Sequence, residues 1–275
     1  MPSHQESSAW QGPAASRLKR IYGRPPLEVV LSAVQTLRID HGITGPAFSP
    51  HSYATALGVQ VNESAALAVD GLLAKTDDGL MVVTLRKSAP SKRKRFTLAH
   101  EVAHAMLFEA LTLRDERLGE PITGHDLEEE RLCNLAAAEM LMPRIFFARD
   151  IRKDDILTPL SLFRAAATYG VSLQAAANQA VSILPSLICV FWERQGRNIE
   201  PLWVAPKYVE PLRPCLNGHS SIEAAFRSPG EVSTHRDTFY RLGHGRLSRL
   251  TTTCTLNDSK AFSVIAPART PRNLR

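Results

Sequence analysis

The chain has 275 residues, 44% hydrophobic and 22% charged, a composition typical of a globular protein with one large or two smaller hydrophobic cores. No apolar run approaches the roughly 18 residues of a transmembrane helix, so we expect no membrane-spanning segment. The cysteines lie far apart without a C-x-x-C pair, which predicts a reduced, cytoplasmic protein without a disulfide framework.

The formal net charge of +6 is concentrated in the last quarter of the chain. From residue 201 onward there are eleven Lys and Arg against five Asp and Glu. Such an excess can attract nucleic acid or an acidic partner. The segment lacks the interleaved aromatic residues of a single-strand binder, so we interpret it as a solvated basic surface.

The N-terminal part predicts a tail followed by two helices. Residues 1–25 are polar and lack the apolar core of a signal peptide, so we expect a disordered tail. Apolar residues at helical spacing predict a helix from residue 26 that stops at Gly42. A short helix is predicted over 49–58, with Ser49 before Pro50 as its N-cap.

Strand-like segments come next. A short one covers residues 59–61, and two apolar runs, 68–75 and 80–87, flank the sequence Thr76-Asp77-Asp78-Gly79. An Asp-Gly pair between two apolar runs is a strong signal for a β-hairpin. We therefore predict that these two runs pair as antiparallel strands.

The segment RFTLAHEVAHAMLF, residues 95–108, places His100, Glu101 and His104 in the order H-E-x-x-H within a predicted helix. Residues i and i+4 lie on the same helix face, so both imidazoles can face one ion. Glu101 lies about 100° round the helix, where it reaches a metal-bound water without being a ligand. The alternative, a buried helix with two core histidines, leaves several polar groups without partners, so we favour a metal site.

Zinc suits this pattern because it accepts two His and one carboxylate and keeps a fourth position for water. It lowers the pKa of that water to about 7 and polarises a peptide carbonyl. Glu101 then takes the proton of the water and delivers it to the leaving amine. Manganese or another divalent ion is the alternative, which metal supply decides.

A third ligand has to come from elsewhere, because the extended motif H-E-x-x-H-x-x-G-x-x-H fails at its last two positions. A helix predicted over 127–142 supplies Glu130 and Glu139, which are nine residues apart and lie about 180° apart around the helix. Both cannot face one ion. Helical geometry alone leaves Glu130 mildly ahead of Glu139, with His125 third.

The two motif segments together resemble the ImmA/IrrE family of bacterial zinc metallopeptidases. That family has R-F-T-x-A-H-E-x-x-H and, after a variable loop, E-x-x-[AC]-N followed by Ala and then Leu, Met and Pro. The Glu of the second element is the family's third ligand, which implies Glu130 here. The resemblance spans roughly residues 26–184. The matching residues are Arg95, Phe96, Thr97, Ala99, His100, Glu101 and His104, then Glu130, Cys133, Asn134, Ala137, Leu141, Met142 and Pro143.

The resemblance implies an α+β fold with a minimal thermolysin-like (zincin) peptidase domain, in which a small β-sheet lies beside the two ligand-bearing helices. Members typically cleave a helix-turn-helix transcriptional repressor and so release genes for stress responses or mobile-element transfer. We therefore expect a zinc-dependent endopeptidase of narrow specificity whose partner is such a repressor.

Two further helices, joined at Tyr169-Gly170-Val171-Ser172, resemble a helix-turn-helix. The second has no Arg or Lys for phosphate or guanine, so we interpret the pair as structural or repressor-docking, with direct DNA binding as the less favoured alternative. Beyond it, two antiparallel strands are expected around residues 194–197. Longer relatives carry a sensor-like domain resembling a GAF fold in this place, for which about ninety residues are few.

The predicted organisation has four parts: a disordered tail (1–25), an ImmA/IrrE-type metallopeptidase domain (26–157), a helix-turn-helix-like unit (158–185) and a small C-terminal α/β region (186–275). Two rival functions stay open. One is a non-catalytic, metal-stabilised transcription regulator that binds DNA or a repressor, and the other is a toxin–antitoxin-type partner. Glu101 favours the peptidase, because neither rival needs a general base.

Overall fold

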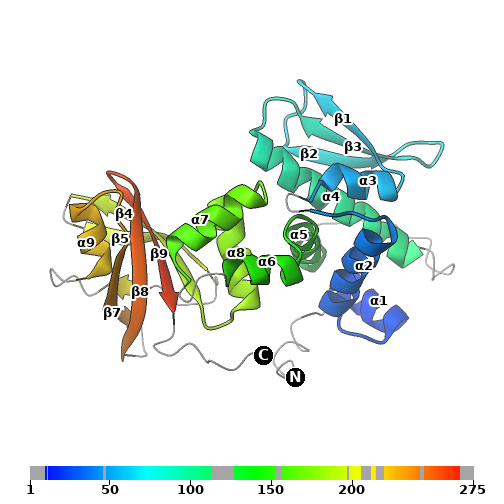
Figure 1. Ribbon diagram of the computed structural model, residues 1–275. Helices are drawn as coiled ribbons and strands as arrows, with labels where there is room; N and C mark the ends of the chain where they lie inside the picture. The colour runs from blue at the N-terminus through cyan, green and yellow to red at the C-terminus, as the bar shows by residue number, and fades with distance from the viewer. Residues whose placement is uncertain are drawn as a thin grey trace. The chain divides into compact units, whose positions relative to one another are not determined.

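The computed structural model describes residues 10, 12–45, 48–112, 127–152, 157–196, 198–205, 212–214, 220–241 and 245–266. The chain divides into two compact units, one of residues 1–143 with 169–171 and the other of residues 144–168 with 172–275. Each unit contains helices and its own sheet, so the protein is α+β, as predicted (Figure 1). None of the described helices is both long enough and apolar enough to cross a bilayer.

The first unit begins with three helices, α1 (Pro13–Tyr22), α2 (Pro26–Asp40) and α3 (Pro50–Ala56), each with Pro in its first turn. We expected a disordered tail over residues 1–25, but residues 13–22 form helix α1, so the expectation was wrong for these residues. The fully buried Ala14, Ala15 and Leu18 dock the helix, a contact that its short, basic sequence did not reveal. Ser49 is the N-cap residue of α3, as predicted, but its side chain makes no capping hydrogen bond.

The predicted hairpin is confirmed. Strands β2 (Gly71–Lys75) and β3 (Met81–Arg86) pair antiparallel, and Gly79 takes a positive φ of 88° in the turn between them. Strand β1 (Gln60–Ser64) pairs parallel with β3, which gives the order β1-β3-β2 and leaves β2 at one edge of the sheet.

Helices α4 (Ser91–Thr112) and α5 (Leu127–Leu141) form the centre of the unit. Helix α4 packs on β2 and β3 with one face and on α5 with another (Figure 1). It extends beyond residues 95–108, where the helix was predicted, and the basic residues Lys92, Arg93 and Lys94 lie in its first turn. Asp70 pairs with Arg93 and Glu63 with Lys94, which offsets the unfavourable placement of cations at a helix N-terminus.

Residues 169–171 belong to the first unit although the chain around them belongs to the second. The Arg95 guanidinium donates to the carbonyls of Phe48 and Tyr169, and the rings of these two residues stack at 6.4 Å. Gly170 has a φ of 64°, and a Cβ there would lie 3.3 Å from Nε of Arg95, so both the backbone conformation and the close approach favour glycine.

The second unit opens with α6 (Arg144–Ile151), α7 (Pro159–Thr168) and α8 (Leu173–Ile183), and α6 packs on both of the others. The predicted pair of helices around Gly170 is therefore present. Helix α6 groups with this unit rather than with the segment before it. The functional boundaries at residues 157 and 185 stay predictions.

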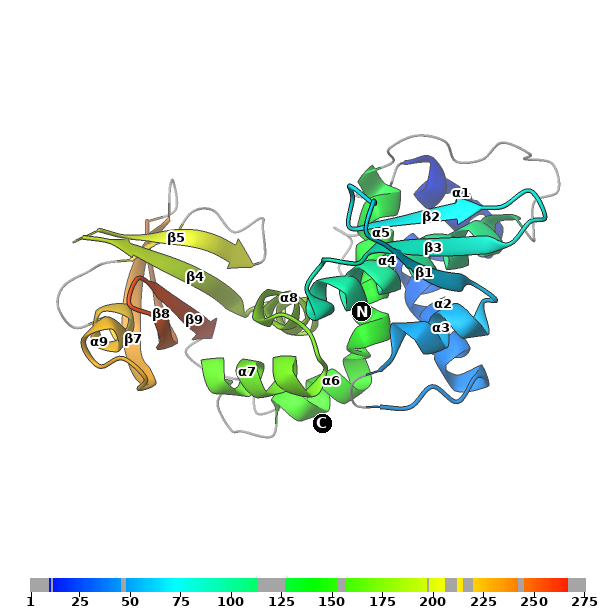
Figure 2. The ribbon, with the colours of Figure 1, turned by 90° about the horizontal axis from the view of Figure 1, so that it is seen from above.

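Six strands follow in the order β5-β4-β9-β8-β7-β6, and every pairing is antiparallel, so this region is α+β rather than α/β. Helix α9 (Ser221–Arg227) packs on β7, β8 and β9 (Figure 2). Helix α7 contacts β8 and β9, and its Phe163 ring meets the Phe262 ring of β9 edge to face. The strands are β4 (Ile188–Gln195), β5 (Asn198–Ala205), β6 (Leu212–Pro214), β7 (Ser233–Arg241), β8 (Gly245–Asn257) and β9 (Lys260–Ala266).

A chain of buried hydrogen bonds ties α9 to this sheet. The carboxylate of Asp237 accepts from the backbone N–H and the hydroxyl of Ser221 at the start of α9. The hydroxyl of Ser221 also contacts Thr253, which contacts Ser263, and the Trp192 indole donates to Ser263 at 2.7 Å. Since these groups are buried, each needs its partner, and the network fixes the register of α9 on the strands.

We expect Asp237→Ala to destabilise the second unit by about 1–3 kcal/mol, because the buried N–H of Ser221 loses its acceptor. The measurement is the urea dependence of thiol labelling at Cys189, which is fully buried in β4. Asp258→Ala, in the exposed turn between β8 and β9, is the matched control. Equal labelling midpoints for the two variants would contradict the role of the network.

Candidate metal centre

The two histidines of α4 converge as their i, i+4 spacing predicts. Nε2 of His100 lies 3.2 Å from Nε2 of His104, and the rings meet edge to face at 4.8 Å. Both side chains are largely buried, with exposed fractions of 16% and 19%. The paired nitrogens therefore point at one spot.

Helix α5 adds a carboxylate to this spot. Glu130 places Oε2 3.2 Å from Nε2 of His100 and Oε1 3.3 Å from Nε2 of His104. One ligand atom from each of the three residues can be chosen so that all lie within 4.8 Å of one another. The structure thus brings together the three predicted ligands, while their binding of a metal stays a prediction.

The donor set and its spacing fit a zinc ion. Two nitrogens at about 2.0–2.1 Å from one tetrahedral ion lie about 3.3–3.4 Å apart, close to the 3.2 Å between the imidazoles. Two imidazoles and one carboxylate are the ligands of a catalytic zinc with one open position. The side chain of Glu130 is 47% exposed, so water can reach the cluster from the side of Glu130.

His104 has a second partner that orients its ring. Nδ1 of His104 lies 3.0 Å from Oε1 of Glu129, an arrangement in which Nδ1–H donates and Nε2 keeps its lone pair for an ion. Burial lowers the pKa of His104, but the hydrogen bond to Glu129 and the charges of Glu129 and Glu130 outweigh it and raise the pKa overall. A metal ion therefore competes with a proton for His104.

The pKa of His100 shifts in the opposite direction. Burial, and then the neighbouring charge of His104, lower its pKa, against smaller opposing contributions from Glu130 and Asn134. The neutral ring that this favours is the form that binds metals. Asn134 also donates to the main-chain carbonyl of Glu130 at 2.8 Å, which supports the turn that carries the carboxylate.

Glu101 lies on the sheet side of α4. Burial raises its pKa and the charge of Glu130 adds to this, whereas the charge of His104 and a hydrogen bond from the backbone of Leu73 in β2 oppose it. Gly71 allows this close approach, because a Cβ there would lie 2.4 Å from Cγ2 of Thr97 and 3.3 Å from Oε1 of Glu101. A carboxylate with a raised pKa beside two imidazoles is suited to accept a proton.

The alternative third ligands do not meet the histidines in the described residues. Glu139 lies near Tyr53 of α3, where it adds to the effect of burial in raising the pKa of the tyrosine hydroxyl. It therefore faces away from His100 and His104, as its position half a turn round α5 from Glu130 requires. His125 lies outside the described residues.

A second group of potential ligands, His104, Glu129 and Cys133, shares one histidine with the first. Binding through sulfur needs a thiolate, but burial and the charges of Glu129 and Glu130 raise the pKa of the Cys133 thiol. We therefore interpret Glu129 as the orienting partner of His104. Our sequence analysis missed it, although a metal-binding imidazole needs an acceptor for its other N–H and the run Glu128-Glu129-Glu130 offered one.

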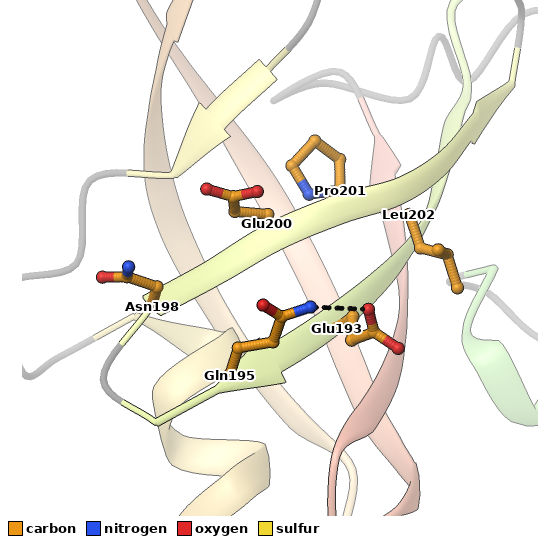
Figure 3. Close-up of a pocket in the computed structure, with 6 residues that line it drawn as sticks. All are labelled: Glu193, Gln195, Asn198, Glu200, Pro201 and Leu202. Carbon is orange, nitrogen blue, oxygen red and sulfur yellow. Dashed lines mark hydrogen bonds between the residues drawn. The ribbon is translucent and has the colours of Figure 1, made fainter.

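The second unit contains a hollow of a different kind, on the β4–β5 hairpin (Figure 3). Its carboxylates, Glu193 and Glu200, are cross-strand partners. Gln195 donates to Glu193 at 3.1 Å, and Lys260 pairs with the same carboxylate at 3.8 Å. The lining contains no imidazole and no thiol, so the H-E-x-x-H chemistry has no counterpart there.

Comparison with known proteins finds a family match for the part of the chain that contains these residues. Residues 54–180 match the family model Peptidase_M78, described as the IrrE N-terminal-like domain. This match, together with the relatives below, assigns this part of the chain to the ImmA/IrrE family. The predicted family is thereby confirmed.

Two relatives are radiation response metalloproteases called IrrE. The chain is 38% identical to the Deinococcus radiodurans protein over 74 residues, which are 26% of this chain and 22% of that protein. It is 38% identical to the Deinococcus deserti protein over 79 residues, 28% of this chain and 26% of that protein. The matches thus span about a quarter of the length of these curated relatives.

A solved structure, that of a Mycobacterium tuberculosis transcriptional regulator, shares the fold with a TM-score of 0.53 at 12% identity. The likeness covers 92% of this chain and 79% of that one. It therefore extends to both units, beyond the residues that the family model matches.

We expect Glu129→Ala to weaken zinc binding about 10- to 100-fold, because His104 loses the acceptor that fixes its tautomer and ring orientation. Glu129→Gln keeps an acceptor and should recover most of the affinity. The dissociation constant is measured by competition with a chromophoric chelator, with Glu109→Ala, an exposed glutamate of α4, as the control. Unchanged affinity in Glu129→Ala would rule out this role.

A second expectation concerns the contact between β2 and α4. Gly71→Ala should lower the free energy of unfolding by about 1–3 kcal/mol, because the added methyl overlaps Cγ2 of Thr97. The double variant Gly71→Ala/Thr97→Ser removes that methyl and should regain most of the loss in urea unfolding. If the changes in the free energy of unfolding caused by the two substitutions are additive, the contact between Gly71 and Thr97 does not limit the approach of β2 to α4.

Proposed function

We propose that this chain is a zinc-dependent endopeptidase in which His100, His104 and Glu130 hold the ion and Glu101 is the general base. The observation that carries the proposal is the convergence of two imidazole nitrogens and one carboxylate, with a second carboxylate beside them whose pKa is raised. A minimal thermolysin-like domain accounts for the arrangement, since the helix that carries both histidines packs on a small sheet with one face and on the helix that carries Glu130 with another.

In this proposal the ion supplies Lewis acidity, which makes a water easier to ionise and polarises the scissile carbonyl. Glu101 accepts the proton of the attacking water and passes it to the leaving nitrogen. Its partial burial makes the carboxylate a stronger base, and the N–H of Leu73 orients it. Glu129 accepts a hydrogen bond from Nδ1–H of His104, which leaves Nε2 of the neutral ring to bind the ion.

We further propose that the substrate binds as an extended segment along β2. This strand forms an edge of the sheet and packs on α4, and its Leu73 contacts the proposed base. Pairing with an edge strand is a common way to hold a peptide in extended form. It would bring the scissile bond close to Glu101.

The substrate that the family suggests is a helix-turn-helix repressor in the cytoplasm, and we keep it as a proposal. The helix pair α7 and α8 is then a docking element rather than a DNA reader. The exposed residues of α8 include Gln174 and Asn178, and the helix carries no Arg or Lys, so it offers little to phosphate or guanine. The described cysteines, Cys133, Cys189 and Cys254, are free thiols, which suits a reducing compartment.

Incubation of purified wild type and Glu101→Gln with helix-turn-helix repressors encoded next to its gene tests the proposal. We expect wild type to cut at least one of them, and Glu101→Gln to cut it at least about 100-fold more slowly while it retains zinc. Cleavage should also stop on chelation and return with zinc. Mass spectrometry of the fragments gives the cleaved bond.

Three outcomes would count against this function. Cleavage by Glu101→Gln at the wild-type rate would remove Glu101 from the chemistry. Stable binding of a repressor without cleavage would favour a non-catalytic regulator or a toxin–antitoxin-type partner. Rapid digestion of unfolded casein would argue against narrow specificity alone.

A further inference from the structure

Helix α1 contacts the last turn of α4. The guanidinium of Arg17 donates to the carbonyl of Leu111 at 3.1 Å, and the hydroxyl of Tyr22 donates to the carbonyl of Ala110 at 3.2 Å. Carbonyls in the last turn of a helix lack partners within that helix. The two side chains therefore cap α4, and a cation at this end also complements the helix dipole.

The residues just before α1 contact the first turns of α5. The backbone N–H of Gly12 donates to Oε2 of Glu128 at 2.6 Å. The guanidinium of Arg131 lies over the ring of Trp10, with its carbon 4.7 Å from the centre of the ring. Glu128 and Arg131 stand on either side of Glu129 and Glu130 in the sequence, so these contacts hold the turn that carries the third ligand.

We call Trp10, Gly12 and α1 the N-terminal clasp, because they bridge the two ligand-bearing helices. Ala14, Ala15 and Leu18 are fully buried, which supplies the stability that an isolated ten-residue helix does not have in water. The clasp contacts α4 just before residues 113–126 and α5 just after them. It also precedes the residues 54–180 that match the family model.

We propose that the N-terminal clasp positions Glu130 against the two histidines and thereby raises the affinity of the site for its metal. The inference rests on the proposed metallopeptidase function and adds a determinant from outside the two motifs. Direct packing of α4 on α5 brings the helices together. The clasp fixes the ends of both helices before the ion binds. Less conformational entropy is therefore lost on binding.

The test uses the full chain with the double substitution Arg17→Met/Tyr22→Phe, which removes both donors to α4 and keeps most of the side-chain volume. Lys19→Met, an exposed position of the same helix, is the matched control. A second variant, Trp10→Leu, removes the ring under Arg131. We expect the double variant and Trp10→Leu to bind zinc on the order of tenfold more weakly than wild type and Lys19→Met.

Hydrogen exchange of the metal-free proteins gives an independent result. We expect faster amide exchange at residues 128–134 in both clasp variants and unchanged exchange in α2 and α3. Wild-type affinity and exchange in the clasp variants would overturn the proposal, and so would faster exchange throughout the first unit, which indicates general destabilisation. Failure of the wild type to bind zinc would overturn the metal site itself, whereas equal zinc binding by wild type and clasp variants would overturn the clasp alone.

Discussion

A carboxylate of one helix can reach two imidazoles of another only if the helices pack closely. Helix α5 presents the small, fully buried Cys133, Ala136 and Ala137, and α4 presents the equally buried Ala99 and Ala103. Small side chains at a helix contact let the backbones approach. The distances of 3.2 and 3.3 Å from Glu130 to the imidazoles depend on this packing, and so does each assignment of a role within the site.

The same packing creates the electrostatics of the site. Because Glu129 and Glu130 lie next to each other on α5, one contacts Nδ1 and the other Nε2 of His104. Their charges raise the pKa of His104, whereas burial lowers the pKa of His100. A divalent ion suits this environment, since the carboxylates of Glu129 and Glu130 favour positive charge and both imidazoles offer a nitrogen lone pair. The cluster is thus better suited to a cation than to two core histidines.

Features that local chemistry determines could be predicted from the sequence. The Asp-Gly turn gave the β2–β3 hairpin, and the spacing of His100 and His104 gave a shared face on α4. Glu130 was different, because helical geometry placed it only mildly ahead of Glu139 and the family resemblance was needed to decide between them. The orientation of α5 against α4, a tertiary property, places Glu139 near Tyr53 instead.

Features that depend on tertiary contacts were missed. Helix α1 is short and basic, and its folding depends on the burial of Leu18 and its alanines in the first unit. The first turn of α4 precedes the segment 95–108 in which the helix was predicted, because its neutralisation by Asp70 and Glu63 comes from the strand region. Glu129 was overlooked because its role is defined by the far nitrogen of His104 rather than by a sequence motif.

X-ray absorption at the zinc edge on the purified, zinc-loaded protein tests the central claim most directly. The two candidate ligand clusters differ in their donor atoms. The cluster with Cys133 contains a sulfur, whereas the cluster with Glu130 contains only nitrogen and oxygen. We predict one zinc per chain, with nitrogen and oxygen neighbours at about 2.0–2.2 Å and no sulfur neighbour, and loss of this zinc in Glu130→Ala. A sulfur neighbour at about 2.3 Å, or zinc retained unchanged in Glu130→Ala, would contradict the account.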